Sequence, residues 1–268
     1  MRWMARDRRC TTVVVVALTT MLLAAAGARG EDQPPPPTDV VTDIGRGPDY
    51  DPWQRMNRGV FWFNDHLDHY LLEPAATGWD RVMPDRVQSS IANFFANLRF
   101  PIVMVNNLLQ GKVQPAVIDV GRFMINTTIG VAGFFDPATD WGLPRHNEDF
   151  GQTLGWWGVP PGPYLVLPLL GPSNPRDTGG LVVDYGLSVT PFFVGGYALM
   201  GAGAINAINA RSMVLQQVKQ AKQASLDYYV FVRNAYYQRR VALINDQEQN
   251  GGSTKDDLYD IDVTNDTR

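Results

Sequence analysis

The stretch DFGQTLGWWGVPPGPYLVLPLLGPSNPRDTGG, residues 149–180, carries no formal charge between Asp149 and Arg176. Five prolines lie between residues 160 and 172. Proline lacks a backbone N–H and holds φ near about −65°, so we expect no regular helix or central strand to run through this stretch. Its part YLVLPLL, residues 164–170, is too apolar for a loop in water. An irregular apolar segment has to be buried in protein, line a cavity or contact lipid, which favours a protein that handles lipid.

The two ends of the chain lie outside the expected folded part. Residues 1–28 show the three parts of a cleaved export signal, namely arginines, an apolar run at 13–26 and small residues. A retained membrane anchor is the alternative, although the run is shorter than the roughly 20 residues that cross a bilayer. We expect a proline-rich tether at 29–50, a helical domain at 51–245 and an acidic disordered tail at 246–268.

Composition and motifs argue against several classes of function. Cys10 is the only cysteine and precedes the apolar core of the signal, so we expect neither a disulfide nor a reactive thiolate in the mature chain. A net charge of −4 gives no nucleic-acid footprint. His66 and His69 are not expected to form a metal site, because Leu67 and Leu71 define the buried face and leave Asp65, Asp68 and His69 mainly on the polar, solvated side of the helix. The chain has no G-x-S-x-G motif, so we expect neither an enzyme nor a cofactor.

Apolar periodicity predicts an all-α fold. Asp51 is expected to cap a first helix that has Pro52 at its first position. Residues at spacings of three and four define the predicted buried face of this helix: Met56, Val60, Phe63, Leu67 and Leu71. Further helices are expected after Pro84, from near Pro101 to Gly111, from near Pro115 to Gly130, and as one long helix over 211–245.

Several short uncharged segments leave two interpretations of this helical domain. Residues 100–111, 123–135 and 188–210 are uncharged, and the last segment has too many Gly and Asn residues for a good membrane span. Helices that lie within one leaflet of a membrane fit this pattern. A soluble helical protein with an unusually apolar interior fits it equally well, because buried helices look the same.

Five long blocks of sequence carry a resemblance that distinguishes these interpretations. They are DPWQRMNRGVFWFNDHLDHYLLEPAA at 51–76, NFFANLRFPIVMVNNLLQGK at 93–112, RFMINTTIGVAGFFDPA at 122–138, EDFGQTLGWWGVPPGPYLVLPLLGPSNPRDTGG at 148–180 and YYVFVRNAYYQRR at 228–240. Together they resemble the MlaA family, also called VacJ, over roughly residues 50–240.

The resemblance implies a ring of amphipathic helices embedded in one membrane leaflet around a central amphipathic channel. It implies a place in the periplasmic leaflet of the outer membrane of a Gram-negative bacterium. Members of the family extract mislocalised phospholipid from the outer leaflet and pass it to a periplasmic lipid carrier beside a trimeric porin, which maintains outer-membrane lipid asymmetry. The alternative is a soluble periplasmic lipid-binding or scaffold protein without channel activity.

The resemblance also suggests which residues meet lipid. The block GPYLVLP is expected to line or support the channel through Tyr164, Leu165, Val166, Leu167, Leu169 and Leu170, with ordinary core packing as the alternative. Residues 143–149 match a loop at the channel mouth, where Leu143, Arg145 and Asp149 are expected to meet a head group. A solvated loop is the other interpretation of that segment. Gly158, Gly162 and Gly171 are expected to serve backbone turns.

One feature of the family is missing from the signal. Members are commonly lipoproteins with an acylated cysteine directly after the apolar run of the signal. Here that place has the sequence AAAGARGED, so we expect no lipid anchor by this route. A single acyl chain binds membranes only marginally, so its absence should not abolish the membrane association of an embedded ring.

Overall fold

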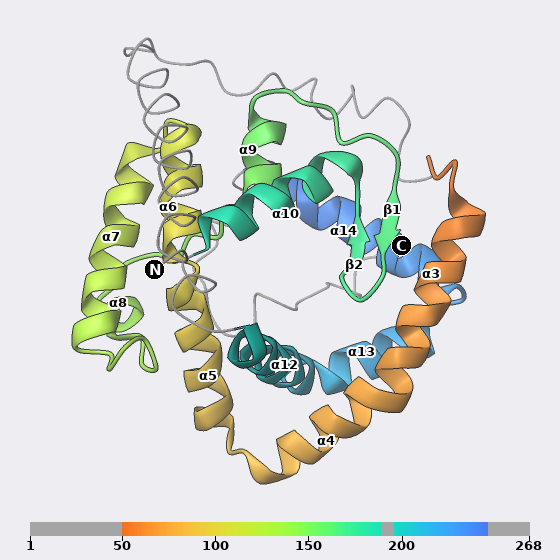
Figure 1. The fold of residues 1–268 in the computed structure, drawn as a ribbon, viewed down its shortest axis with the longest axis horizontal. Helices are drawn as coiled ribbons and strands as arrows, with labels where there is room; N and C mark the ends of the chain where they lie inside the picture. The colour runs from red at the N-terminus through yellow and green to blue at the C-terminus, as the bar shows by residue number, and fades with distance from the viewer. Residues whose placement is uncertain (1–49, 189–195, 246–268) are drawn as a thin grey trace, which may run out of the picture.

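The computed structural model describes residues 50–188 and 196–245, which form a ring of short helices (Figure 1). The elements are α3 (Gln54–Leu67), the π-helix η1 (Asp68–Leu72), α4 (Glu73–Val82), α5 (Asp85–Leu98), α6 (Phe100–Leu109), α7 (Val113–Thr128), α8 (Pro137–Asp140), α9 (Phe150–Trp156), β1 (Leu165–Leu167), β2 (Gly171–Ser173), α10 (Pro175–Leu187), α12 (Gly196–Ser212), α13 (Leu215–Ala224) and α14 (Tyr228–Ile244). The predicted signal and acidic tail lie outside the described residues, as does the predicted tether except for Tyr50. The predicted ring of helices is confirmed, with one small hairpin added.

One half of the ring is a nearly continuous helical arc. The π-turn of η1 joins α3 to α4 without a break in helical dihedrals, and α5 follows after a sharp bend (Figure 1). The bend has a local cause, because Met83 precedes Pro84 and the residue before a proline is pushed out of the α region. Met83 accordingly has φ −96° and ψ 116°.

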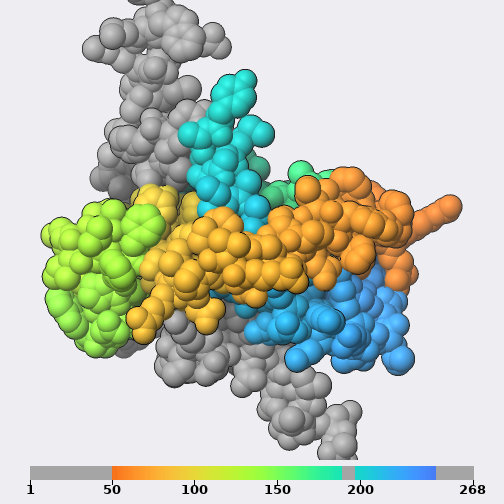
Figure 2. Space-filling view, turned by 90° about the horizontal axis from the view of Figure 1, so that it is seen from below, coloured from red at the N-terminus to blue at the C-terminus, as the bar shows by residue number. Residues whose placement is uncertain are grey.

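The other helices close the ring. Inside the arc, α12 packs against α4 and α5, while α14 contacts α9 and β2. An ion pair of 2.6 Å between Arg58 of α3 and Asp227 joins the start of the arc to the residue that caps α14. Seen edge-on, the ring is flat, with α4 and α5 along the near rim and the start of α12 rising above it (Figure 2). None of the described helices is both long enough and apolar enough to cross a membrane.

The distribution of polar and apolar side chains is the reverse of that in an ordinary soluble bundle. The most deeply buried large side chains are mainly polar: Gln152, Glu148, Asn57, Asn106, Asn107, Asn174, Asn209 and Thr153 accompany Tyr164 and Val166. Large apolar residues lie on the surface instead, with Trp62 and Leu71 each 61% exposed. The predicted buried face of the first helix is therefore wrong for Met56, Phe63 and Leu71, which are all exposed. The periodicity was correct, but of this set only Val60 packs against the core, while Met56, Phe63 and Leu71 are exposed.

The predicted polar face near the two histidines is also partly wrong, because one of its residues faces the interior of the ring. Asp68, expected on the solvated side, pairs with Arg211 of α12 at 2.7 Å, and its side chain is only 20% exposed. His69 pairs with Glu73 at 3.3 Å on the exposed surface. Asp68 of η1 thus holds the arc to the inner helix.

Three predicted helix boundaries are also wrong. Asp51 does not cap α3, whose N-cap is Trp53 without a side-chain hydrogen bond. Instead the Asp51 carboxylate accepts hydrogen bonds from Asn57 and from the hydroxyl of Tyr229. The long helix expected over 211–245 is three pieces, because the chain turns out of the helix after Ser212 and again at Ser225, before Asp227 caps α14.

The proline-rich stretch contains the start of a helix at each end and a short hairpin between them. Asp149 and Asn174 are side-chain N-caps, so α9 begins directly after the first and α10 directly after the second. Between them β1 and β2 pair antiparallel, with Leu165 opposite Ser173. As expected, no helix or central strand runs through the proline cluster, but capping side chains start helices at both ends of 149–180, outside that cluster. The predicted turn glycines are confirmed by their positive φ values: 85° at Gly158, 75° at Gly162 and 83° at Gly171.

Candidate functional site

A cavity of about 1100 Å³ lies within the ring. Its walls come from α5, α6, α7, α10, α12 and α14 and from the loop that precedes α9. A volume of this size is at the upper end of the range for small-molecule pockets, so it can admit a large ligand.

One part of the wall is apolar and aromatic. Phe95 of α5 and Phe100 of α6 line the cavity together with Phe123 of α7. The rings of Phe100 and Phe123 are stacked, with their centroids 4.4 Å apart. Leu181 and Leu199 extend the apolar lining to α10 and α12. Such a surface suits hydrocarbon better than water.

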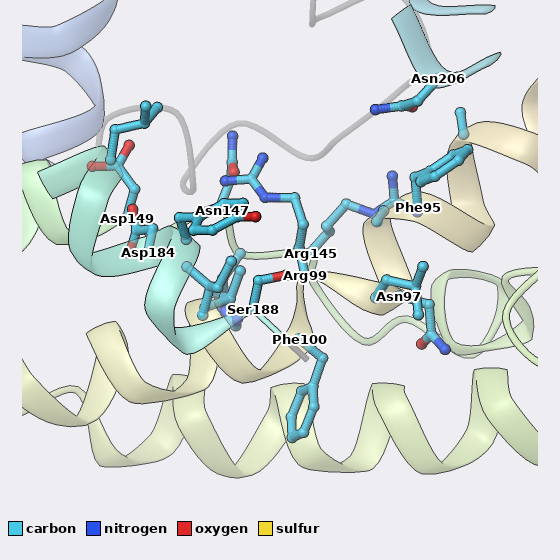
Figure 3. A pocket seen from close by; sticks show the side chains of 18 of the residues that line it. Phe95, Asn97, Arg99, Phe100, Arg145, Asn147, Asp149, Asp184, Ser188 and Asn206 are labelled. Carbon is cyan, nitrogen blue, oxygen red and sulfur yellow. The ribbon is translucent and has the colours of Figure 1, made fainter. Parts of the chain in front are cut away.

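Another part of the wall is densely charged. Arg99 and Arg145 lie near each other in Figure 3, with Asp149 and Asp184 to one side and Phe95 to the other. The cavity is therefore amphipathic, because charged and aromatic side chains share one continuous wall.

Asp149 is held by an arginine that reaches it from α14. Both oxygens of its carboxylate accept from Arg240, at 2.6 and 3.1 Å, and the Nε atom of Arg240 lies 2.8 Å from Asp177. Burial by itself would raise the pKa of Asp149, but the hydrogen bonds and the charge of Arg240 outweigh it and lower the pKa to about 2. Arg240 thus ties α14 to the N-terminal ends of α9 and α10.

A second ion-pair cluster holds Arg145. Asp136 lies 2.8 Å from Arg122 of α7 and 2.7 Å from Arg145, and Arg145 also donates to Asn93 of α5 at 3.0 Å. Burial would raise the pKa of Asp136, but hydrogen bonds from Thr139 and the two guanidinium groups lower it to about 2. These contacts fix the loop before α9 against α5 and α7.

Burial raises the pKa of Asp184, which lines the same wall. Its carboxylate accepts from the backbone N–H of Phe150, at 3.1 and 3.2 Å, and from Asn106 at 3.2 Å. These donors carry no formal charge, so they compensate the lost hydration less fully than an arginine would.

The residues expected from the sequence to meet lipid fall into three places. Arg145 and Asp149 line the cavity, and the backbone carbonyl of Leu143 nearby accepts a hydrogen bond from Arg122. Tyr164 and Val166 are buried in a core cluster with Tyr229 and Tyr237. The hairpin residues Leu165 and Leu167 are half-buried, whereas Leu169 and Leu170 are exposed at the turn, at 70% and 63%.

The lining expected from the sequence did not include four residues of the charged wall, Arg99, Asp184, Arg239 and Arg240, or Asn106, which donates to Asp184 behind that wall. A signal for one of them was available. Asn106 and Asn107 interrupt the apolar run FPIVMVNNLL of α6, and both are fully buried. A polar residue in an apolar helix is expensive unless it is hydrogen-bonded, so it marks a polar interior.

Sequence comparison with known proteins gives matches that cover most of the residues forming the ring. A profile of the family described as MlaA lipoprotein matches residues 49–243. The chain is 38% identical to the intermembrane phospholipid transport system lipoprotein MlaA of Haemophilus influenzae, over 73% of this chain and 80% of that protein. It is 36% identical to the protein of the same name in Escherichia coli (strain K12), over 79% and 88% of the two chains.

A solved structure also matches. It comes from work on the structural basis for maintenance of bacterial outer membrane lipid asymmetry. The TM-score is 0.64 at 34% identity, and the match covers 72% of this chain and 98% of the other.

Proposed function

Since the chain belongs to the MlaA lipoprotein family, we propose that it extracts mislocalised phospholipid from the outer leaflet of the outer membrane through its cavity. The lipid then passes to a periplasmic carrier, which maintains the lipid asymmetry of the membrane. The observation that carries this proposal is the inverted ring, which has apolar side chains on its outside and an amphipathic cavity within. The names of the relatives support the same substrate.

The outward apolar residues support embedding in one leaflet. They occur on the arc, where Leu71 and Val82 are 61% and 74% exposed, and on α7, where Val117 and Met124 are 65% and 62% exposed. The transfer of each such side chain from water into an apolar environment is favourable by roughly 1.5–3 kcal/mol of free energy. The ring therefore lies in the periplasmic leaflet of the outer membrane, with its apolar outer surface covered by lipid tails.

The cavity supports a passive path for lipid. Acyl chains contact its aromatic wall, and the head group meets the charged wall near Arg145. Burying a head group without partners would cost several kcal/mol, so charged side chains within the ring lower the barrier to transfer. The protein performs no chemical reaction on the lipid, and the driving force comes from its partners, a soluble lipid carrier and a trimeric porin.

Membrane association rests on the ring itself in this proposal. The relatives are named lipoproteins, whereas the only cysteine in this sequence is Cys10, which precedes the apolar run of the predicted signal. Outward apolar residues on several helices provide far more contact area than one acyl chain, which binds only marginally.

Fractionation of the native full-length protein tests the proposal. Outer membranes are washed with high salt and then with mild detergent, and lipid bound to the purified protein is identified by mass spectrometry. We expect retention through salt, release by detergent and intact phospholipid in the purified protein. Release by salt without bound lipid would contradict the proposal and favour a soluble scaffold, whereas lysophospholipid products would indicate an enzyme.

A further inference from the structure

The carboxylates that line the cavity already have partners within the protein. The lining contains five arginines and four aspartates, although the whole chain has a net charge of −4. Asp149 and Asp177 share Arg240, and Asp184 accepts from Phe150 and Asn106. The fourth aspartate, Asp119, accepts from Asn107 at 2.7 Å and lies 2.8 Å from the ring of His146.

Two of the five lining arginines, Arg99 and Arg239, differ from the carboxylates in having no such partner in the described part of the chain. Among residues 50–188 and 196–245, neither Arg99 nor Arg239 makes an ion pair or a side-chain hydrogen bond. Arg99 interacts with the carboxylate of Asp184 only by longer-range electrostatic attraction, without a hydrogen bond. The other three arginines of the lining, Arg122, Arg145 and Arg240, are all paired with carboxylates. Two guanidinium groups of the lining therefore have no hydrogen-bonding partner among the described residues, whereas all four lining carboxylates accept hydrogen bonds or pair with an arginine.

The backbone places these two guanidinium groups on different walls. Arg99 is the single residue between α5 and α6, so the bend between the two helices presents it next to the aromatic residue Phe100. Arg239 lies on α14, one residue before the paired Arg240. Both side chains are exposed to the cavity that they line.

A guanidinium is planar, stays charged at any physiological pH and matches a phosphate with two parallel N–H donors. We propose that Arg99 and Arg239, each on its own wall, provide two separate binding points for the phosphodiester of the phospholipid as it passes, while its acyl chains contact the aromatic wall. This inference rests on the proposed function and names the group that the cavity recognises. Because all common phospholipids share the phosphodiester, these arginines select phospholipid against uncharged lipid with the same chains.

A binding assay on the delipidated full-length protein in mild detergent tests this role. The probes are a fluorescent phosphatidylethanolamine and a diacylglycerol with the same acyl chains. We expect the wild type to bind the phospholipid at least tenfold more tightly, because one charge-assisted hydrogen bond contributes roughly a factor of ten. The double variant Arg99→Gln/Arg239→Gln should lose most of this preference and bind diacylglycerol unchanged.

Two further variants separate a phosphate contact from a structural role. Arg99→Lys/Arg239→Lys keeps both charges and should retain part of the preference, while its circular dichroism and melting temperature match the wild type. Arg86→Gln removes an exposed arginine of the same α5 helix that does not line the cavity, and it should bind as the wild type does.

The outcomes distinguish this inference from the proposed function. If the Gln double variant binds phosphatidylethanolamine as tightly as the wild type, the role of the two arginines is wrong and lipid transport stands. If the wild type binds neither probe, both proposals fail. Inorganic phosphate at millimolar concentration should not displace the phospholipid. Displacement by phosphate combined with equal binding of both lipids would reveal an anion site unrelated to lipid and would overturn the inference.

Discussion

Asn57 and Asn64, two helical turns apart on α3, together take the place of a third strand beside β1. The amide of Asn57 donates to the carbonyl of Tyr164 at 2.9 Å and accepts from the N–H of Val166 at 3.0 Å. Asn64 repeats this pattern with the carbonyl of Leu167 at 2.9 Å and the N–H of Leu169 at 2.8 Å. The free edge of the hairpin is thereby satisfied by side chains.

Replacement of Asn57 should therefore destabilise the ring. Asn57→Ala leaves a buried backbone carbonyl and a buried N–H without partners, at about 1–3 kcal/mol each. We expect a loss of about 3 kcal/mol in the free energy of unfolding, measured by urea in detergent. Asn57→Asp should recover only part of this loss, because a carboxylate accepts from Val166 but does not donate to Tyr164.

Asn64→Ala is the matched control for this effect. The hydrogen bond from Leu169 is exposed, so water can replace the lost amide there. We expect a smaller loss, below about 1.5 kcal/mol. Equal losses for the two alanine variants would show that burial of the hairpin edge near Asn57 does not matter.

Periodicity predicted most of the helices, but it did not reveal which side of them faces inward. Phe63 and Leu71 recur at helical spacing, as in a soluble bundle, yet both are exposed. The period of a pattern is independent of the solvent around it, so a ring in lipid and a bundle in water produce similar apolar stripes. Asn57 and Asn64 carried the missing information, since they lie seven residues apart on one stripe of the helix and are the residues that contact the hairpin.

The crossing of α9 and α10 provides a second prediction. A Cβ on Gly180 would lie 2.4 Å from the backbone nitrogen of Gly151, which no side-chain rotation can relieve. Gly180→Ala should therefore push the two helices apart and lower the free energy of unfolding by about 1–3 kcal/mol. Thermal unfolding in detergent measures this change.

Gly179→Ala is the adjacent control on the same helix. A Cβ there meets nothing within 4 Å. Alanine has a higher helix propensity than glycine, so this variant should be stabilised by roughly 0.5–1 kcal/mol. If Gly180→Ala were as stable as Gly179→Ala, the close approach of α9 and α10 would not be required for the fold.

Charges on the outer face of α7 should weaken membrane binding without unfolding the protein. Val117 and Met124 are 65% and 62% exposed, and neither lines the cavity. Val117→Glu/Met124→Glu would place two charges in the hydrocarbon region, so we expect a large drop in the fraction retained by liposomes in a flotation assay. Stability in detergent should change by less than about 0.5 kcal/mol per site, as for other surface substitutions.

Gln114→Glu adds a charge to an exposed position near the start of the same helix and should leave flotation unchanged. If the double variant floats as well as the wild type, the outer surface of α7 does not contact lipid. The ring would then associate with membranes through a different face.

The charged wall was less predictable than the helices because its residues meet only in three dimensions. Arg145 and Asp149 were expected from one loop, but their partners come from α5, α14 and the turn after α7. Arg240 lies 91 residues from Asp149 along the chain. The pattern YYQRR that contains Arg240 is equally compatible with a solvated helix face and with a buried ion pair, so local sequence does not distinguish them.

The pair formed by Asp149 and Arg240 predicts a defined pH dependence of stability. The pKa of Asp149 is lowered from 3.8 to about 2 in the folded protein. A lowered pKa contributes stability above the unfolded value, near pH 4, and this contribution disappears as the pH falls through about 2. The shift corresponds to about 2 kcal/mol.

The variant Asp149→Asn isolates the ionisation of this side chain, because asparagine can still cap α9 through its carbonyl oxygen but does not titrate, and it loses the charge and one of the two oxygens that accept from Arg240. The difference in unfolding free energy between wild type and variant should be about 2 kcal/mol larger at pH 6 than at pH 2. This difference removes the contributions of Asp136, which changes stability in the same direction, and of Asp184, whose raised pKa acts in the opposite direction.

Arg240→Gln and the double variant Asp149→Asn/Arg240→Gln complete a double-mutant cycle, which separates the coupling between the two side chains from the loss of each alone. The coupling energy should be largest at pH 6 and should shrink at pH 2, where Asp149 is partly protonated and its attraction to Arg240 weakens. A coupling energy that does not change between these pH values would show that the hydrogen bonds of Arg240, rather than the charge of Asp149, hold α14 against α9.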